Sequence, residues 1–169
     1  MKIFTGVLSV LLLLVFSSCQ KSVEQQEDAN KKRADEFKTF LTTAGKFHAV
    51  DYYAETPIDY NEQDDEVILE TDLKKYIRNY LLDDDIYFQN DGKIRFVQND
   101  VKIAGESAPE IYVPYKVWGD KTGVMVDYVD DQYQPLTYML HEKGSTYFIL
   151  SWRRPQDGVR LFSRYELKL

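Results

Sequence analysis

The chain contains few of the residues that most often carry catalysis or hold a metal. Cysteine occurs once, at Cys19, and histidine twice, at His48 and His141. A single cysteine closes no internal disulfide, and the chain has no phosphate-binding glycine loop, no G-x-S-x-G and no H-E-x-x-H. Both histidines fall in predicted strands, where a lone histidine is usually structural. We therefore expect no enzyme. A hydrolase stays the alternative, because two carboxylates placed across a cleft leave no mark in a sequence.

Basic residues are also in short supply. The 21 lysines and arginines are outnumbered by 28 aspartates and glutamates, and they form no basic stripe. A chain with this balance binds nucleic acid poorly, so we expect no nucleic-acid partner. The neighbouring carboxylates at 64–65, 83–85 and 130–131 fall at predicted turns, where water relieves their repulsion.

Long apolar runs are missing except at the start of the chain. Lys2 precedes a mostly apolar run over residues 3–16, and two serines and Cys19 follow it. A positive start, an apolar run and small residues are the order of a secretory signal peptide. The run is shorter than the ~20 residues that a helix needs to span a bilayer.

The stretch FSSCQK, residues 16–21, resembles the lipobox of bacterial lipoproteins. In that family the cysteine becomes the first residue of the mature chain and carries the lipid, and two or more acyl chains anchor a protein firmly. The resemblance implies that residues 1–18 are a lipoprotein signal peptide, that Cys19 is lipidated, and that the membrane is a partner through this lipid. A buried free cysteine in an ordinary signal sequence is the alternative.

Residues 19–33 are polar and charged, which predicts a flexible tether. Gln20 stands where an aspartate would indicate inner-membrane retention in some bacteria, so we expect the cell envelope, and within it the outer membrane. Lys21 and the acids behind it loosely resemble the export signal of surface lipoproteins in Bacteroidota-like bacteria. Whether the domain faces the periplasm or the cell surface stays open.

Residues 34–169 form the predicted folded domain, whose core must suffice without disulfides. Helical spacing of apolar residues predicts one helix over 30–44, with Gly45 as its C′ glycine, and a second over 72–82. Period-two alternation and recurring turn residues predict eight strands. Their ranges are 47–53, 85–89, 93–98, 110–118, 123–129, 136–141, 146–153 and 159–169. Pro114 in the fourth of these predicts a sheet edge or a bulge.

Eight consecutive antiparallel strands close most simply into a barrel, which removes exposed edges. We therefore predict a mainly β fold, an eight-stranded antiparallel up-and-down barrel with one or two short helices packed outside. The segments FHAVDYY, IDYNEQDDE, DLKKYIRNYLL, IYFQNDGKIRF and RYELKL resemble the small lipocalin-like (calycin-type) lipoproteins common in Bacteroidota, whose domain has no known function. The resemblance covers residues 45–169 and implies a lipocalin-like barrel. Phe47 stands in the tryptophan place of the lipocalin Gly-x-Trp mark.

The acidic loop IDYNEQDDEVILE, residues 58–70, is the candidate metal site. Counted from Asp59, side chains that carry oxygen fall at positions 1, 3, 5, 7 and 12 of an EF-hand calcium loop. The candidate ligands are Asp59, Asn61, Gln63, Asp65 and Glu70. Position 6 is Asp64 where the motif needs glycine, so a solvated acidic loop is the alternative. We expect no cofactor, and any calcium to bind weakly.

Aromatic residues are abundant, with 13 tyrosines, nine phenylalanines and two tryptophans. Their faces stack on apolar ligands, and tyrosine adds a hydroxyl that orients them. Alternation gives seven candidate inward, ligand-binding residues: Phe88, Phe96, Tyr115, Tyr128, Tyr138, Tyr147 and Tyr165. The predicted function is a lipid-anchored envelope module that binds a small apolar or amphipathic ligand. The alternative is an envelope protein-interaction or inhibitor module whose barrel is filled by its own side chains.

Overall fold

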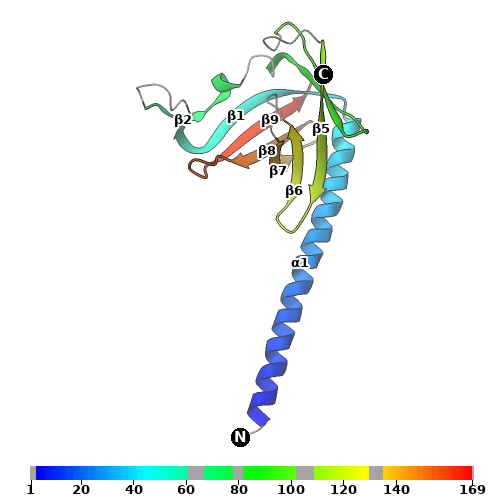
Figure 1. The fold of residues 1–169 in the computed structure, drawn as a ribbon, viewed down its shortest axis with the longest axis vertical. Coiled ribbons are helices and arrows are strands. Elements are labelled where there is room, and N and C mark those ends of the chain that lie inside the picture. The colour runs from blue at the N-terminus through cyan, green and yellow to red at the C-terminus, as the bar shows by residue number, and fades with distance from the viewer. Residues whose placement is uncertain (1–2, 61–66, 78–81, 102–108, 130–134, 169) are drawn as a thin grey trace.

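The fold is a closed antiparallel β-barrel with one long helix packed against it (Figure 1). The computed structural model describes residues 3–60, 67–77, 82–101, 109–129 and 135–168, with side chains from residue 22 onward. Along the chain, helix α1 covers Ile3–Thr43 and a single 3₁₀ turn, η1, covers Lys74–Tyr76. The strands are β1 Lys46–Asp59, β2 Leu69–Asp72, β3 Asp85–Phe88, β4 Lys93–Val97, β5 Glu110–Gly119, β6 Val124–Val129, β7 Pro135–Lys143, β8 Tyr147–Arg153 and β9 Arg160–Leu167.

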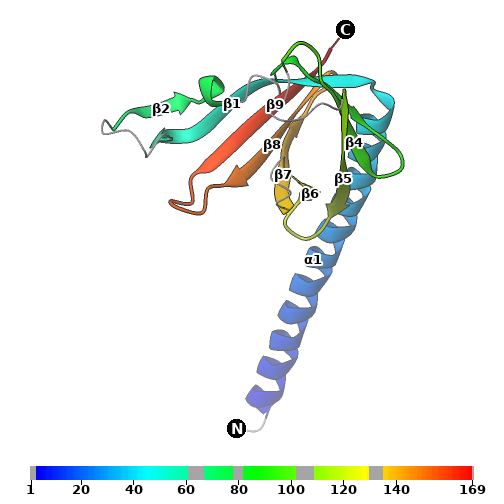
Figure 2. The ribbon, with the colours of Figure 1, turned by 45° about the horizontal axis from the view of Figure 1, so that its top comes forward.

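The barrel closes because β1 pairs with strands on both sides. Its first residues pair with β3, and a longer stretch pairs with β9, from Phe47 opposite Leu167 to Ala54 opposite Leu161. Each strand from β3 to β9 pairs antiparallel with the next. The predicted eight-stranded up-and-down barrel is therefore confirmed. Figure 2 shows the strands curving around a common interior.

One strand was not predicted. The far part of β1 runs beyond the barrel, and β2 pairs with it antiparallel, with Tyr53 opposite Asp72 and Ile58 opposite Glu70. The two strands form the arm that extends away from the barrel in Figure 1. The sequence favoured a loop here because β2 has only four residues, and acidic side chains make up half of them.

Alternation along the strands was predicted correctly where two faces could be compared. On β5, Val113 and Tyr115 belong to the core while Tyr112 is exposed. Pro114, expected at an edge or bulge, lies instead where β5 changes partner. Pro114 pairs with Lys93 of β4, and the ladder with β6 begins at Tyr115. A proline fits this position because the change of partner leaves no ladder that needs its missing N–H.

Helix α1 ends where expected but begins much earlier than the predicted residue 30. Gly45 follows it with φ of +107°, a conformation that favours glycine. Ala34, Phe37 and Leu41 are spaced at helical intervals, are 1–3% exposed, and join the barrel core. The division into a leader over 1–18, a tether over 19–33 and a domain over 34–169 stays a prediction. Among the residues that the structure describes, no helix is long and apolar enough to cross a membrane.

The start of the packed part of α1 is fixed by a close approach to β5. The Asn30 side-chain amide donates a hydrogen bond to the Asp120 carbonyl at 2.8 Å, and Asn30 is 5% exposed. A Cβ added at Gly119 would lie 2.3 Å from the Asn30 carbonyl oxygen. Gly119 therefore permits a helix–strand approach that no larger residue allows without displacement.

The predicted second helix, over 72–82, is wrong over residues 72–77, whereas Leu82 is helical. Asp72 ends β2, η1 makes one turn, and Ile77 is extended with ψ of 127°. The Leu73 N–H donates to the Tyr52 carbonyl, and the Lys74 N–H donates to the Asp72 carboxylate. Pairing with β1 thus outweighs the helical periodicity, although Leu73 is still buried as the apolar pattern required. Residues 78–81 lie outside the described residues.

Candidate functional site

Two aromatic clusters divide the barrel interior. We name the first the phenylalanine cluster, which consists of Phe37, Phe40, Phe47, Phe88 and Phe148. We name the second the tyrosine cluster, which consists of Tyr52, Tyr60, Tyr128, Tyr138, Trp152 and Tyr165. Four members of the first cluster are buried, whereas every member of the second except Tyr138 keeps partial exposure.

The phenylalanine cluster is a packed core. Phe148 meets Phe47 edge-on with ring centroids 5.2 Å apart, and it meets Phe37 of α1 at 5.5 Å. Phe47 is fully buried, and Phe37 and Phe148 are each 1% exposed. Edge-to-face contacts at these distances add to the free energy of hydrophobic burial. Side chains fill this half of the barrel, with α1 packed against it.

The members of the tyrosine cluster lie on inward faces of their strands, except Tyr60, which follows β1. Tyr128 of β6 and Tyr138 of β7 stack in parallel with centroids 4.9 Å apart, and Tyr138 also meets Trp152 of β8 at 6.4 Å. Tyr52 of β1 meets Tyr60 edge-on at 5.8 Å. The partly exposed rings therefore come from strands on opposite sides of the closed barrel.

The polar ends of these rings lie close to one another. The Tyr128 hydroxyl lies near those of Tyr138 and Tyr165, the Tyr165 hydroxyl lies near Ser163, and these neighbours contribute to the pKa shifts of Tyr128 and Tyr165. The hydroxyls of Tyr52 and Tyr60 lie 3.4 Å apart, and Tyr52 also interacts with Trp152. A buried hydroxyl needs such partners, since an unpaired one costs about 1–3 kcal/mol. The result is a set of neighbouring neutral hydroxyls that can both donate and accept hydrogen bonds.

The raised pKa values of these hydroxyls indicate that bulk water has little access to them. Burial is the largest cause that raises the pKa of Tyr128, followed by the nearby Tyr165 and Tyr138. Burial likewise raises the pKa of Tyr165 and of Tyr52. Yet Tyr128 and Tyr165 retain accessible surface. Tyr128 and Tyr165 thus pack against the core, with part of each residue still accessible.

Six of the seven predicted inward residues face the interior, and one prediction is wrong. Tyr128, Tyr138 and Tyr165 belong to the tyrosine cluster, and Phe96 packs partly buried against the core. Phe88 and Tyr115 lie in the filled half, where their rings meet at 5.2 Å.

Tyr147 faces outward, because it occupies the same strand face as Ile149, opposite to Phe148. Its hydroxyl donates to Glu142, and the Arg164 guanidinium lies 4.2 Å from its ring centroid. An alternating aromatic strand has two apolar faces, and the sequence pattern alone favoured the wrong one.

Sequence reasoning missed three members of the tyrosine cluster. Trp152 alternates with Phe148 and Leu150 on the inward face of β8, so its strand pattern contained the signal. Tyr52 was hidden by the register shift of β1 between Ala49 and Asp51, which changes the parity of inward positions. Tyr60 lies just after β1 ends, where alternation no longer applies.

The calcium-loop candidates are only partly described. Asp59 and Glu70 occupy adjacent ladder positions of β1 and β2, with Ile58 opposite Glu70, so alternation places their side chains on opposite faces. Glu70 forms an ion pair with Lys75 at 2.6 Å. Asn61, Gln63 and Asp65 lie outside the described residues. Calcium binding by this loop stays a prediction. Over the described part of the chain, no three histidine, cysteine or acidic side chains come together as a metal site.

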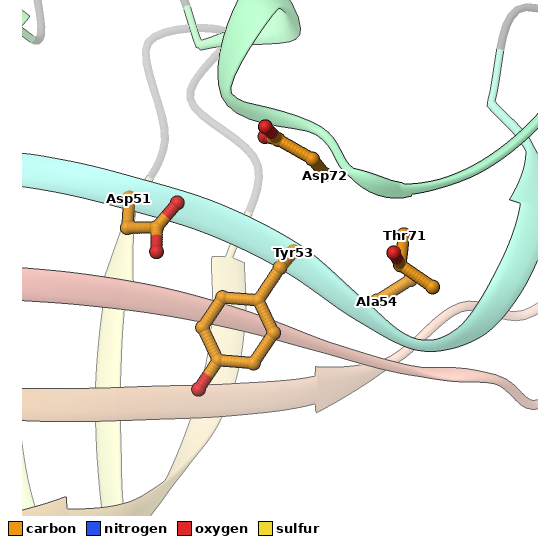
Figure 3. Close-up of a pocket in the computed structure, with 5 residues that line it drawn as sticks. All are labelled: Asp51, Tyr53, Ala54, Thr71 and Asp72. Atoms are coloured by element: carbon orange, nitrogen blue, oxygen red, sulfur yellow. The ribbon is translucent and has the colours of Figure 1, made fainter.

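A hollow lies outside the barrel, where β1 and β2 separate. It has a volume of about 460 Å³ and is lined by Asp51, Tyr53, Ala54, Thr71 and Asp72 (Figure 3). Asp51 accepts a hydrogen bond from the Tyr52 N–H and Asp72 accepts one from the Lys74 N–H. Tyr53 stacks on Phe162 with ring centroids 4.8 Å apart. Open walls and two like charges distinguish this hollow from the tyrosine cluster.

The two histidines lie apart from both aromatic clusters. His48 pairs with Glu166 on the outer face of the β1–β9 ladder. The ring centroids of His141 and of the outward-facing Phe162 are 4.8 Å apart. Neither histidine therefore faces the tyrosine cluster.

Comparison with known proteins gives no family. No protein-family model matches the chain, and neither a curated protein nor a solved structure gives a significant match. The choice of the tyrosine cluster as the candidate site therefore depends on the geometry of this structure alone.

Proposed function

We propose that this protein is a lipid-anchored binding module of the cell envelope that holds a small ligand with an apolar body against the tyrosine cluster. The observation that carries the proposal is the contrast between the two halves of one barrel. The phenylalanine cluster is closed by close packing, while Tyr52, Tyr128, Trp152 and Tyr165 face inward and keep accessible surface. A barrel of eight strands is wide enough to hold one small ligand.

The chemistry of the cluster fits binding better than catalysis. Ligand sites combine apolar walls with a few placed polar groups, and the cluster offers aromatic faces with hydroxyls at their ends. Among its described members there is no carboxylate, histidine or amine that could act as a general base near neutral pH. We accordingly infer binding without chemical conversion, with a hydrolase as the less favoured alternative.

Anchoring is the second part of the proposal. The lipobox-like stretch supports lipidation of Cys19, and α1 joins that position to the barrel as one helix. Processing before Cys19 would leave a mature chain with 20 basic and 28 acidic residues, a net charge of −8. We propose the outer membrane as its location and a lipocalin-like lipoprotein as its kind, both on the sequence resemblance.

The experiment is native mass spectrometry of the full chain purified from membranes of its host. The proposal predicts a noncovalent adduct of small-molecule mass that is lost in Tyr138→Leu. A matched variant in the filled half, Phe47→Leu, should keep the adduct. Absence of any adduct from the wild type, together with no binding of added small amphiphiles, would exclude the proposed function.

A second candidate is a protein-interaction module, favoured by the exposed surface of the β1–β2 arm. Val67, Ile68 and Leu69 are consecutive and 73%, 45% and 64% exposed. Leu69 begins the edge strand β2, Val67 and Ile68 precede it, and exposed apolar residues at a sheet edge are a common site of strand addition. A photo-crosslinker at Leu69, but not one at the exposed Tyr112 of β5, would then give a defined cross-linked product in cells.

A further inference from the structure

We propose that the ligand of the tyrosine cluster is electrically neutral and carries a hydroxyl group on an apolar body, and that the site discriminates against carboxylates and phosphates. This inference rests on the proposed function and adds the chemical class of its ligand. Such a site would suit a carrier of alcohols, sterol-like or glycosidic molecules, and it would not suit a carrier of fatty acids.

The first argument is that the described inward positions around the tyrosine cluster carry no positively charged side chain. From Tyr52 on β1 to Tyr165 on β9, these positions hold tyrosine, tryptophan, apolar residues and one serine, Ser163. Lys143 shares the inward parity of Phe148, but its ammonium group lies 4.5 Å from the Phe40 ring centroid, in the phenylalanine half.

Two described arginines on or next to the strands that carry the tyrosine cluster have other partners. Arg154, two residues beyond Trp152, donates to the Asp157 carboxylate and, at 3.0 Å, to the Asp59 carbonyl. Arg164 faces outward and forms an ion pair with Glu166 at 2.8 Å. The fully buried Asp84 adds an acid, not a base, to the interior. A buried anion would therefore lack the positively charged partner that normally offsets its desolvation.

The second argument comes from the tyrosines themselves. The loss of hydration that raises the pKa of Tyr128 acts in the same way on any negative charge placed beside its ring. A neutral hydroxyl avoids that cost. It can donate to one tyrosine oxygen and accept from another, because Tyr128, Tyr138 and Tyr165 bring three hydroxyls close together. The cluster thus offers full hydrogen bonding to an alcohol and poor solvation to an anion.

The test compares two probes that differ only in the head group, 1-octanol and octanoate, at neutral pH. The two tryptophans make the readout specific. Trp152 belongs to the tyrosine cluster, while Trp118 faces outward and donates to Asp127 at 2.7 Å. In a Trp118→Phe chain, whose fold is checked by circular dichroism, the remaining fluorescence reports Trp152. We expect saturable binding of octanol at least about tenfold tighter than binding of octanoate.

A charge-supplying variant tests the cause of the preference. Leu136, partly buried opposite Tyr128 near the first residue of β7, can be changed to lysine, whose long stem lets the ammonium group reach the end of the barrel. Leu136→Lys should raise octanoate affinity at least about tenfold relative to octanol, and the neutral Leu136→Met should not. Both variants are first checked for thermal unfolding midpoints near that of the parent.

The outcomes separate this inference from the function on which it rests. Tighter octanol binding that Leu136→Lys reverses supports both. Equal or tighter octanoate binding in the parent chain overturns the neutral-ligand inference and leaves the binding function intact. Binding of neither probe, with no co-purified adduct, overturns both.

Discussion

Phe148 stacks on Tyr165 with ring centroids 4.9 Å apart and planes inclined by 15°. This contact joins the phenylalanine cluster to the tyrosine cluster, because Phe148 also meets Phe37 and Phe47 while Tyr165 lies beside Tyr128. Closely packed residues on one side of it stabilise the barrel. On the other side lie partly exposed rings with polar ends, to which we assign ligand binding. The predictions below test each part separately.

Helix α1 should be an integral part of the barrel's stability. Phe37 is 1% exposed and contacts Phe148 inside the barrel, so Phe37→Ala leaves a large void beside the phenylalanine cluster. We expect a loss of about 3–5 kcal/mol in the free energy of unfolding, measured by urea denaturation. The neighbouring Lys38→Ala, on the exposed side of the helix, serves as the control and should change it by less than about 0.5 kcal/mol. Equal effects of both changes would mean that α1 is not packed as described.

The approach of α1 to β5 should depend on the missing side chain at residue 119. A Cβ there would lie 2.3 Å from the Asn30 carbonyl oxygen and 2.7 Å from the Lys31 nitrogen, both backbone atoms that cannot rotate away. Gly119→Ala should therefore destabilise the fold by about 1–3 kcal/mol, read as a lower unfolding midpoint. At Gly144 the nearest atoms belong to the Tyr147 side chain, which can move, so Gly144→Ala should cost less. A neutral Gly119→Ala would contradict the close contact.

The burial of Tyr128 should appear as alkaline instability. Burial raises its pKa in the folded state above the value of about 10 in an unfolded chain. The raised pKa gives stability that is fully present below about pH 10 and is lost as the pH rises toward the folded pKa. Tyr128→Phe should thus show a shallower loss of unfolding free energy above pH 10 than wild type, by up to about 1.4 kcal/mol per pH unit. Below pH 10 the difference between the two proteins should stay constant. Parallel curves at alkaline pH would show that Tyr128 is solvated.

Lipidation of Cys19 should decide where the protein is found. Cells grown with an alkyne-tagged fatty acid should incorporate label into the wild-type chain, which should partition with membranes. Cys19→Ser should abolish both the label and the membrane association. Label retained by Cys19→Ser, or a mature chain beginning elsewhere than residue 19, would exclude the lipobox interpretation.

The barrel was predictable from the sequence because its signals are local. Alternation on β5 and β9 and the turns between strands identified all eight barrel strands, and Gly45 marked the end of α1. The predicted second helix is wrong at its start, residues 72–77, for a non-local reason. Its apolar stripe is genuine, but pairing of Leu69–Asp72 with the distant β1 removes the first turn.

The candidate site was only half predictable for the same reason. Alternation identified Tyr128, Tyr138 and Tyr165, since each lies on a regular strand whose two faces differ in polarity. It assigned Tyr147 to the wrong face because both faces of β8 are apolar. Tyr52 lies beyond an irregularity of β1 that no sequence pattern marks. That the inward aromatics divide into a packed and a partly exposed group depends on where α1 packs, which no strand pattern contains.

The most direct test of the account is to locate binding within the barrel. In the Trp118→Phe chain, Trp152 fluorescence is titrated with 1-octanol, then again after Tyr138→Leu and after Phe47→Leu, two changes that exchange one ring for the same aliphatic side chain. The account predicts saturable binding that Tyr138→Leu weakens at least about tenfold, and that Phe47→Leu changes by less than about threefold once the folded fraction is accounted for. Equal weakening by both changes, or no saturable response in the parent chain, would contradict it.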